Sequence, residues 1–183
     1  ENLVRFAALI SMSNRANGRT GMGAVMGSKN LKAVVVRGKQ KPTIAHPETF
    51  KELQKWGTAN LEATGMDGFG KYGTPGETTS QNKAGGLPTY NFNSGTFDKH
   101  EEIDGITLYN DHLRGHERDE QNRFGRDTCF SCSVKCKRVT QIDEGPYKTE
   151  AKYGGPEYET IATFGSYCGI SNMDAIIHAN ALC

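Results

Sequence analysis

No apolar run in the sequence approaches the roughly 20 residues that a helix needs to cross a bilayer, so no membrane span is expected. The sequence also lacks an excess of charge of one sign, since 22 Lys and Arg face 21 Asp and Glu, a net charge of +1. That balance argues against a protein that coats nucleic acid. Charged residues make up 23% and aromatic residues 9% of the 183 residues, which indicates a folded globular chain.

The start of the chain has neither an initiator methionine nor a secretory signal. Residues 172–183 have the pattern of a helix, and neither Gly nor Pro follows to end it. We therefore expect an internal segment of a longer protein, with the remainder of the parent chain as its first partner.

Positive charge is concentrated near the start of the chain. Residues 1–41 hold eight Lys and Arg but one acid, a net charge of +7, whereas residues 42–183 have a net charge of −6. A basic, glycine-rich head on an acidic chain indicates a local anionic ligand, although a solvated basic face is the simpler alternative. The change in composition at Pro42 predicts a domain boundary there, between segments 1–42 and 43–183.

Two apolar, β-like runs, residues 3–11 and 31–37, flank a glycine-rich segment over residues 14–29. Glycines let backbone N–H groups approach an anion, and arginines can bind phosphate oxygens. The segment is not a Walker loop, because no Gly-Lys-Ser/Thr follows at the required spacing. It is not the dinucleotide fingerprint either, because Gly21-Met22-Gly23 lacks the third glycine. It therefore predicts a site for a phosphate-like group.

The segment after Pro42 changes in character. Residues 47–63 have the spacing of an amphipathic helix, and we predict that Phe50 and Trp56 lie in the core. Residues 65–93 are rich in glycine, so we predict one long loop there.

Five cysteines, an odd number without a secretory signal, argue against a disulfide framework. Three of them, Cys129, Cys132 and Cys136, follow a C-x₂-C-x₃-C pattern that brings thiolates toward one centre. The neighbouring cations would favour the thiolate form and offset the negative charge of a cluster; they are Arg126, Lys135, Lys137 and Arg138.

Three kinds of metal site compete for this triplet. A zinc site needs a second pair of ligands, and none follows at close spacing. The radical-type iron–sulfur triplet has the two spacings in reverse order. A cubane [4Fe–4S] cluster takes three close cysteines and one remote cysteine, and it fits best. The spacing leaves the remote ligand open between Cys168, Cys183 and a residue outside the chain.

Five segments occur in one order along the chain: residues 15–33, residues 86–92, the cysteine triplet, residues 155–160 and residues 165–170. Together they resemble the aldehyde ferredoxin oxidoreductase family of tungsten or molybdenum pterin enzymes, whose chains are several hundred residues longer. The resemblance implies an α+β fold. In it, residues 1–42 end a β-rich pterin-binding domain, and residues 43–183 begin a mainly α-helical domain that carries iron–sulfur ligands.

The resemblance also implies cofactors and the residues that hold them. A tungsten- or molybdenum-bis-pterin centre would lie beside a [4Fe–4S] cluster, with Mg²⁺ bridging the pterin phosphates. Cys129, Cys132 and Cys136 match three cluster ligands, the fourth coming from beyond Cys183, and Glu159 matches the carboxylate near the metal. The segment against the pterin phosphates comprises Arg15, Ala16, Gly18, Arg19, Gly21 and Gly23, and the Ala16 carbonyl would help to hold Mg²⁺.

The implied function is oxidation of an aldehyde to a carboxylic acid in a reducing cytoplasm. Glu159 would accept a proton, and electrons would leave through the cluster to ferredoxin or an electron-transfer iron–sulfur subunit. A homo-oligomer is a further expectation. Two other classes stay open: a non-catalytic iron–sulfur electron carrier and a zinc-stabilised binding domain.

Overall fold

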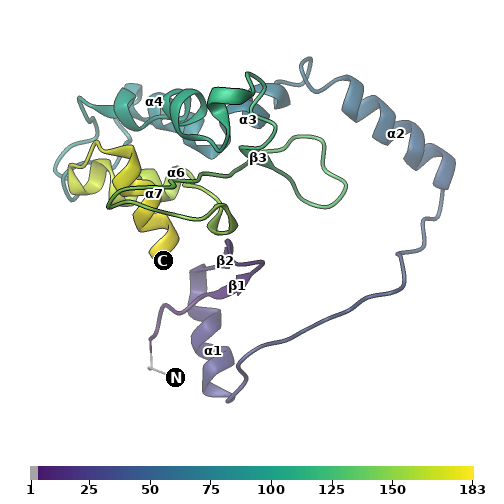
Figure 1. Ribbon diagram of the computed structural model, residues 1–183. Coiled ribbons are helices and arrows are strands. Elements are labelled where there is room, and N and C mark those ends of the chain that lie inside the picture. Colours follow the sequence, from purple (N-terminus) through teal and green to yellow (C-terminus); the bar gives the residue numbers. More distant parts are fainter. Residues whose placement is uncertain (1–3) are drawn as a thin grey trace. The chain divides into compact units, whose positions relative to one another are not determined.

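Helices and short antiparallel strand pairs together make a mixed α+β fold (Figure 1). The computed structural model describes residues 4–183. The chain forms two units, Glu1–Gln54 and Lys55–Cys183, each with its own internal contacts. None of the described helices has both the length and the apolar character needed to cross a membrane.

The first unit contains a hairpin of β1 (Leu9–Ser11) and β2 (Arg15–Asn17), which pair antiparallel and lead into α1 (Met22–Ser28). β1 confirms the end of the strand predicted over residues 3–11, whose first residue, Leu3, lies outside the described residues.

Two glycines pack the start of α1 against the backbone that leads into β1. Gly21 has a φ of 66°, and a Cβ at this position would lie 2.5 Å from the carbonyl oxygen of Arg5. The N–H of Gly23 donates to the carbonyl oxygen of Ala7 at 2.9 Å, and a Cβ on Gly23 would lie 2.5 Å from that oxygen. Glycine is therefore required at both positions because any side chain would meet backbone atoms.

The strand predicted over residues 31–37 is wrong, since these residues have no regular secondary structure. Val34, Val35 and Val36 are 69%, 92% and 82% exposed. A β-branched run becomes a strand when a neighbouring strand satisfies its backbone groups and covers its side chains. Within residues 4–183 no segment pairs with this run.

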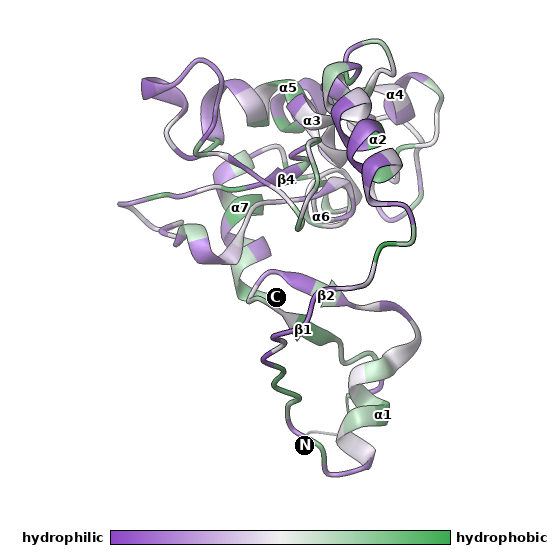
Figure 2. Cartoon of the chain, turned by 90° about the vertical axis from the view of Figure 1, so that its right-hand side faces the viewer, coloured by the Kyte–Doolittle hydropathy of each residue, from purple (hydrophilic) through white to green (hydrophobic). Residues whose placement is uncertain are grey.

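The predicted helix at residues 47–63 is confirmed as α2 (Pro47–Ala59), which ends four residues early. Pro47 occupies its first position, where the missing N–H costs nothing. The prediction that Phe50 and Trp56 lie in a core is wrong, because they are 45% and 60% exposed and α2 has no buried residue. Figure 2 shows α2 mostly in the purple and pale colours of hydrophilic residues.

The long loop predicted over residues 65–93 is also wrong, because it contains α3 (Met66–Tyr72) and α4 (Glu77–Lys83). The glycines mark helix ends instead. Gly65 and Gly73 flank α3 with φ values of 73° and 64°. A positive φ at a helix boundary favours glycine, so a high density of glycine here indicates several short helices.

The core of the second unit is formed by apolar residues from α6 (Tyr158–Phe164), α7 (Met173–Leu182) and the segments between α4 and β3. The helix predicted at the end of the chain is confirmed as α7, and the Asn172 side chain caps it by accepting from the N–H of Ala175 at 3.0 Å. The buried residues are Leu87, Phe97, Ile103, Leu108, Tyr109, Leu113, Ile161, Ala162, Met173, Ile176 and Ile177.

The remaining elements are short. α5 (Gly105–Thr107) runs into a π-helical turn at Leu108–His112, and β3 (Arg126–Asp127) pairs antiparallel with β4 (Lys137–Arg138). Single 3-10 turns lie at Arg19–Gly21, Thr74–Gly76, His100–Ile103, His116–Arg118, Ala151–Tyr153 and Ser166–Cys168.

Candidate functional site: the three-cysteine hairpin

The three clustered cysteines lie on one hairpin loop. β3 and β4 form its stem, in which Arg126 pairs with Arg138 and Asp127 with Lys137. All three thiols are free, with Cys129 exposed and the other two half-buried. The stem therefore presents the whole C-x₂-C-x₃-C triplet from a single turn of chain between residues 128 and 136.

Local hydrogen bonds shape this loop. The Thr128 hydroxyl donates to the carbonyl oxygen of Cys132 at 2.7 Å, and the N–H of Cys132 donates to that of Cys129 at 3.1 Å. Ser131 and Lys135 have φ values of 57° and 58°. A positive φ is uncommon for such residues, and each precedes a cysteine, so the loop reverses direction tightly before two of its three thiols.

The thiols have different electrostatic surroundings. The N–H of Val134 lowers the pKa of Cys132, with help from the Thr128 hydroxyl. The pKa of Cys136 is raised, first by burial and then by the negative charges of Glu157, Cys132 and Cys129. The pKa of Cys136 is thus raised even though the positive charge of Arg138 interacts favourably with its thiolate.

Burial outweighs the cations at Cys136 because a charged thiolate loses its hydration there. The coupling of Cys136 to both other thiols also shows that three thiolates on this loop would repel one another. Positive charge supplied by a bound metal group would relieve this repulsion.

A buried arginine, Arg138, contacts the backbone at the end of the cysteine loop. Arg138 is 1% exposed. Its Nε donates to the carbonyl oxygen of Cys136 at 3.2 Å, and its two terminal nitrogens donate to those of Lys135, Gly70 and Lys71. Burial, followed by the nearby charge of Arg126, lowers the pKa of Arg138 to about 10, while Glu157 and Cys136 act in the opposite direction. The guanidinium therefore stays charged at neutral pH.

Two glutamates near the start of α6 differ in position. Glu157 precedes the helix and is half-buried; its Oε2 accepts a hydrogen bond from the Thr74 hydroxyl at 2.5 Å. Glu159, the candidate identified from sequence, lies exposed in the first turn. The structure thus brings Glu157 into the electrostatic surroundings of Cys136, a role that sequence analysis missed because both acids belong to one short motif.

The predicted phosphate-binding residues lie in the first unit. A cavity of about 370 Å³ there is lined by residues of β1, α1 and the segment after α1, among them Gly23, Gly27 and Lys32. Of the candidates from sequence, Gly23 alone lines it. Arg15 and Ala16 belong to β2, and Arg19 lies exposed in the 3-10 turn that follows Gly18. The structure therefore separates the predicted arginines from this glycine-lined cavity.

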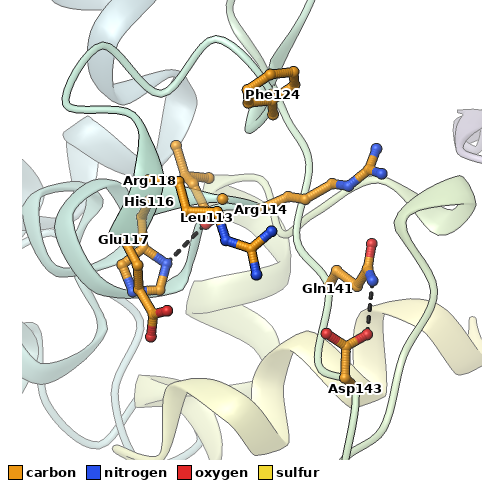
Figure 3. Close-up of a pocket in the computed structure, with 9 residues that line it drawn as sticks. Leu113, Arg114, His116, Glu117, Arg118, Phe124, Gln141 and Asp143 are labelled. Carbon is orange, nitrogen blue, oxygen red and sulfur yellow. Dashed lines mark hydrogen bonds between the residues drawn. The ribbon is translucent and has the colours of Figure 1, made fainter.

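A larger cavity, about 430 Å³, lies in the second unit beside the 3-10 turn at His116–Arg118 (Figure 3). Its charges are mixed, with Arg114 and Arg118 opposed by Glu117 and Asp143. None of the residues predicted from sequence lines it, and we assign it no function.

The hairpin offers three free thiols to a bound metal group. Within residues 4–183, no three His, Cys, Asp or Glu side chains are arranged to hold a metal ion. A single zinc ion needs ligands that converge on one point. The thiolates of a cubane cluster each bind a different iron atom, so three free thiols on one loop fit that group.

Comparisons with known proteins match nearly the whole chain. The family model described as "Aldehyde ferredoxin oxidoreductase, N-terminal domain" matches residues 1–38, and "Aldehyde ferredoxin oxidoreductase, domains 2 & 3" matches residues 48–183. The tungsten-containing aldehyde ferredoxin oxidoreductase of Pyrococcus abyssi is 37% identical over 98% of this chain and 28% of its own length. The tungsten-containing aldehyde ferredoxin oxidoreductase of Thermococcus kodakarensis is 35% identical over 100% of this chain and 28% of its own length.

A relative with a different name also matches. The aliphatic sulfonate oxidoreductase, WOR-like subunit, of Pyrococcus furiosus is 31% identical over 100% of this chain and 27% of its own length. The chain therefore spans a little over a quarter of the length of the curated relatives that it matches.

Proposed function

Because the chain belongs to the aldehyde ferredoxin oxidoreductase family, we propose that its parent protein oxidises aldehydes to carboxylic acids at a tungsten- or molybdenum-bis-pterin centre. Electrons would pass through a [4Fe–4S] cluster to ferredoxin or an iron–sulfur partner subunit. The observation that carries the proposal is the three-cysteine hairpin, which lies inside the family match and presents three free thiols from one loop. We further propose that the parent protein works in the cytoplasm, as a homo-oligomer.

In this proposal Cys129, Cys132 and Cys136 hold three irons of the cluster, and the fourth ligand comes from the rest of the parent chain. The hairpin supports a cluster over the zinc-stabilised binding domain, because three closely spaced cysteines with no second ligand pair nearby in sequence suit a cubane cluster. The cluster, when bound, supplies one-electron transfer.

The glycine-rich segment would lie against the pterin phosphates. Arg15 and Arg19 would bind phosphate oxygens, the Ala16 carbonyl would help to hold Mg²⁺, and the glycines at 18, 21 and 23 would let the backbone come close. The net charge of +7 over residues 1–41 supports an anionic ligand at this end of the chain. Residues 1–42 would then end the pterin-binding domain and residues 43–183 begin the helical one.

Glu159 is proposed as the carboxylate that takes a proton during aldehyde oxidation. Its exposure in the first turn of α6 leaves the carboxylate accessible to substrate, whereas the Glu157 carboxylate accepts the hydrogen bond from Thr74.

The test is elemental analysis of the full-length parent protein, purified without oxygen, together with aldehyde-dependent reduction of a viologen dye. We expect tungsten or molybdenum near one per chain, about four iron atoms and dye reduction. An aliphatic sulfonate belongs in the substrate panel because one relative is named for it. Iron without the heavier metal would favour the non-catalytic electron carrier, and zinc alone the binding domain.

A further inference from the structure

The hydrogen bonds of Arg138 fix its guanidinium between two parts of the second unit. Two acceptors, the carbonyl oxygens of Gly70 and Lys71, lie in α3, and two, those of Lys135 and Cys136, lie in the cysteine loop. All four are backbone atoms, so the charge is held in place by main chain rather than by mobile side chains. Arg138 thus ties the end of the loop to α3.

The contact between α3 and the loop is close on both sides of this guanidinium. A Cβ on Gly70 would lie 2.3 Å from the carbonyl oxygen of Val134. A Cβ on Gly73 would lie 2.8 Å from that of Cys136 and 2.9 Å from Nε of Arg138. The main chain of α3 therefore packs closely on the main chain of the loop around this guanidinium.

A fully buried cation is costly unless nearby negative charge compensates for the lost hydration. The negative groups that interact with Arg138 include Glu157 and Cys136, while Arg126 adds a second positive charge. Carbonyl dipoles and Glu157 compensate part of the cost. A negatively charged group on the three thiols would compensate more of it.

We propose that Arg138 is a positioning residue for the iron–sulfur cluster, because it clamps the cysteine loop to α3 and keeps a buried positive charge behind Cys136 that favours the reduced cluster. Reduction adds one electron to the cluster and breaks no bond, so a fixed cation stabilises the product more than the reactant. Glu157 has the opposite effect, because its negative charge interacts with the same cysteine. This inference rests on the proposed function, since it needs a cluster on the hairpin.

The experiment is a redox titration of the parent protein with dithionite, followed by electron paramagnetic resonance of the reduced cluster, with iron measured in every sample. The variants are Arg138→Met, which removes the charge, Arg138→Lys, which keeps it, and Glu157→Gln, which removes the opposing charge. Arg123→Met is the matched control, because that side chain is 69% exposed and pairs with Asp119.

We expect Arg138→Met to make cluster reduction about tenfold less favourable, a fall of about 59 mV in midpoint potential for one electron. Arg138→Lys should stay near the wild-type potential but retain less iron, because an ammonium cannot reach all four carbonyls. Glu157→Gln should raise the potential, and Arg123→Met should leave it unchanged.

Equal falls in Arg138→Lys and Arg138→Met would overturn the proposal, since loop geometry and not charge would then set the potential. An unchanged potential in Arg138→Met would overturn it too. If Arg138→Met loses the cluster entirely, its midpoint potential cannot be measured. A rise in midpoint potential in Glu157→Gln would then support control of the potential by charge near Cys136, and no rise would overturn the proposal. A wild-type protein with no iron–sulfur signal would instead refute the proposed function.

Discussion

Two glycines of α3 provide a matched pair for measuring how tightly the helix packs against the cysteine loop. Gly68 and Gly70 are both interior residues of one seven-residue helix. Replacement by Ala improves helix propensity by about 1 kcal/mol at either position. At Gly68 nothing lies within 4 Å of the new Cβ, whereas at Gly70 it would lie 2.3 Å from the carbonyl oxygen of Val134 and 3.0 Å from the Arg126 side chain. The two variants therefore differ only in contact with the loop.

The free-energy cost of Gly70→Ala follows from the contact between its new Cβ and the Val134 carbonyl. An ordinary van der Waals contact begins at 3.4 Å, so the Val134 carbonyl must retreat by about an ångström in Gly70→Ala. Overpacking of this kind costs about 1–3 kcal/mol, which cancels or exceeds the gain in propensity. We expect Gly68→Ala to be up to about 1 kcal/mol more stable than wild type. Gly70→Ala should be less stable than Gly68→Ala by about 1–3 kcal/mol.

Denaturant unfolding of the parent protein, followed by circular dichroism, measures this difference, and iron per chain reports the state of the loop. Gly70→Ala should also retain less iron, because Val134 lies between Cys132 and Cys136. Equal stability and equal iron content in the two variants would refute the argument that α3 and the loop are in direct backbone contact.

Two further predictions concern the thiols and the last helix. In metal-free protein, iodoacetamide should alkylate Cys132 at lower pH than Cys136, because the pKa of Cys132 is lowered and that of Cys136 is raised. Peptide mass spectrometry across a pH series would measure the alkylation of each cysteine. Alkylation of Cys136 at the lower pH would contradict the prediction. Asn172→Ala should destabilise α7 by about 1 kcal/mol through loss of the hydrogen bond to the N–H of Ala175. Asn172→Asp, which keeps an acceptor, is the control, and hydrogen exchange of α7 amides is the measurement, with equal exchange in both variants counting against the cap.

Local signals explain what could be predicted of the fold. Pro47 and Asn172 start helices because each suits its terminus without help from distant residues. The end of the first strand was predicted from its apolar run, and its hairpin partner β2 was not predicted. The run over residues 31–37 was misassigned because its apolar pattern says nothing about whether a partner strand lies beside it.

In the candidate site, too, features set by neighbouring residues were predicted and features set by distant residues were not. The spacing of Cys129, Cys132 and Cys136 placed them on one short loop, since so few residues separate them. Glu159 and the phosphate-binding residues remain proposals. The electrostatic effect of Glu157 on Cys136 was not predicted, because 21 positions of sequence separate the two.

The sequence alone therefore determined the thiol triplet, the helices α2 and α7 and the membership of a family, because each depends on residues close together or on order along the chain. Only the tertiary structure decided which of the four cations near the cysteine triplet is buried and hydrogen-bonded to the loop. Arg126, Lys135, Lys137 and Arg138 look alike in sequence, yet Arg138 alone is 1% exposed and donates to four carbonyls. The burial of Arg138 and the direction of its guanidinium depend on α3, which lies more than 60 residues earlier in the chain. A local sequence pattern cannot show a contact between segments so far apart.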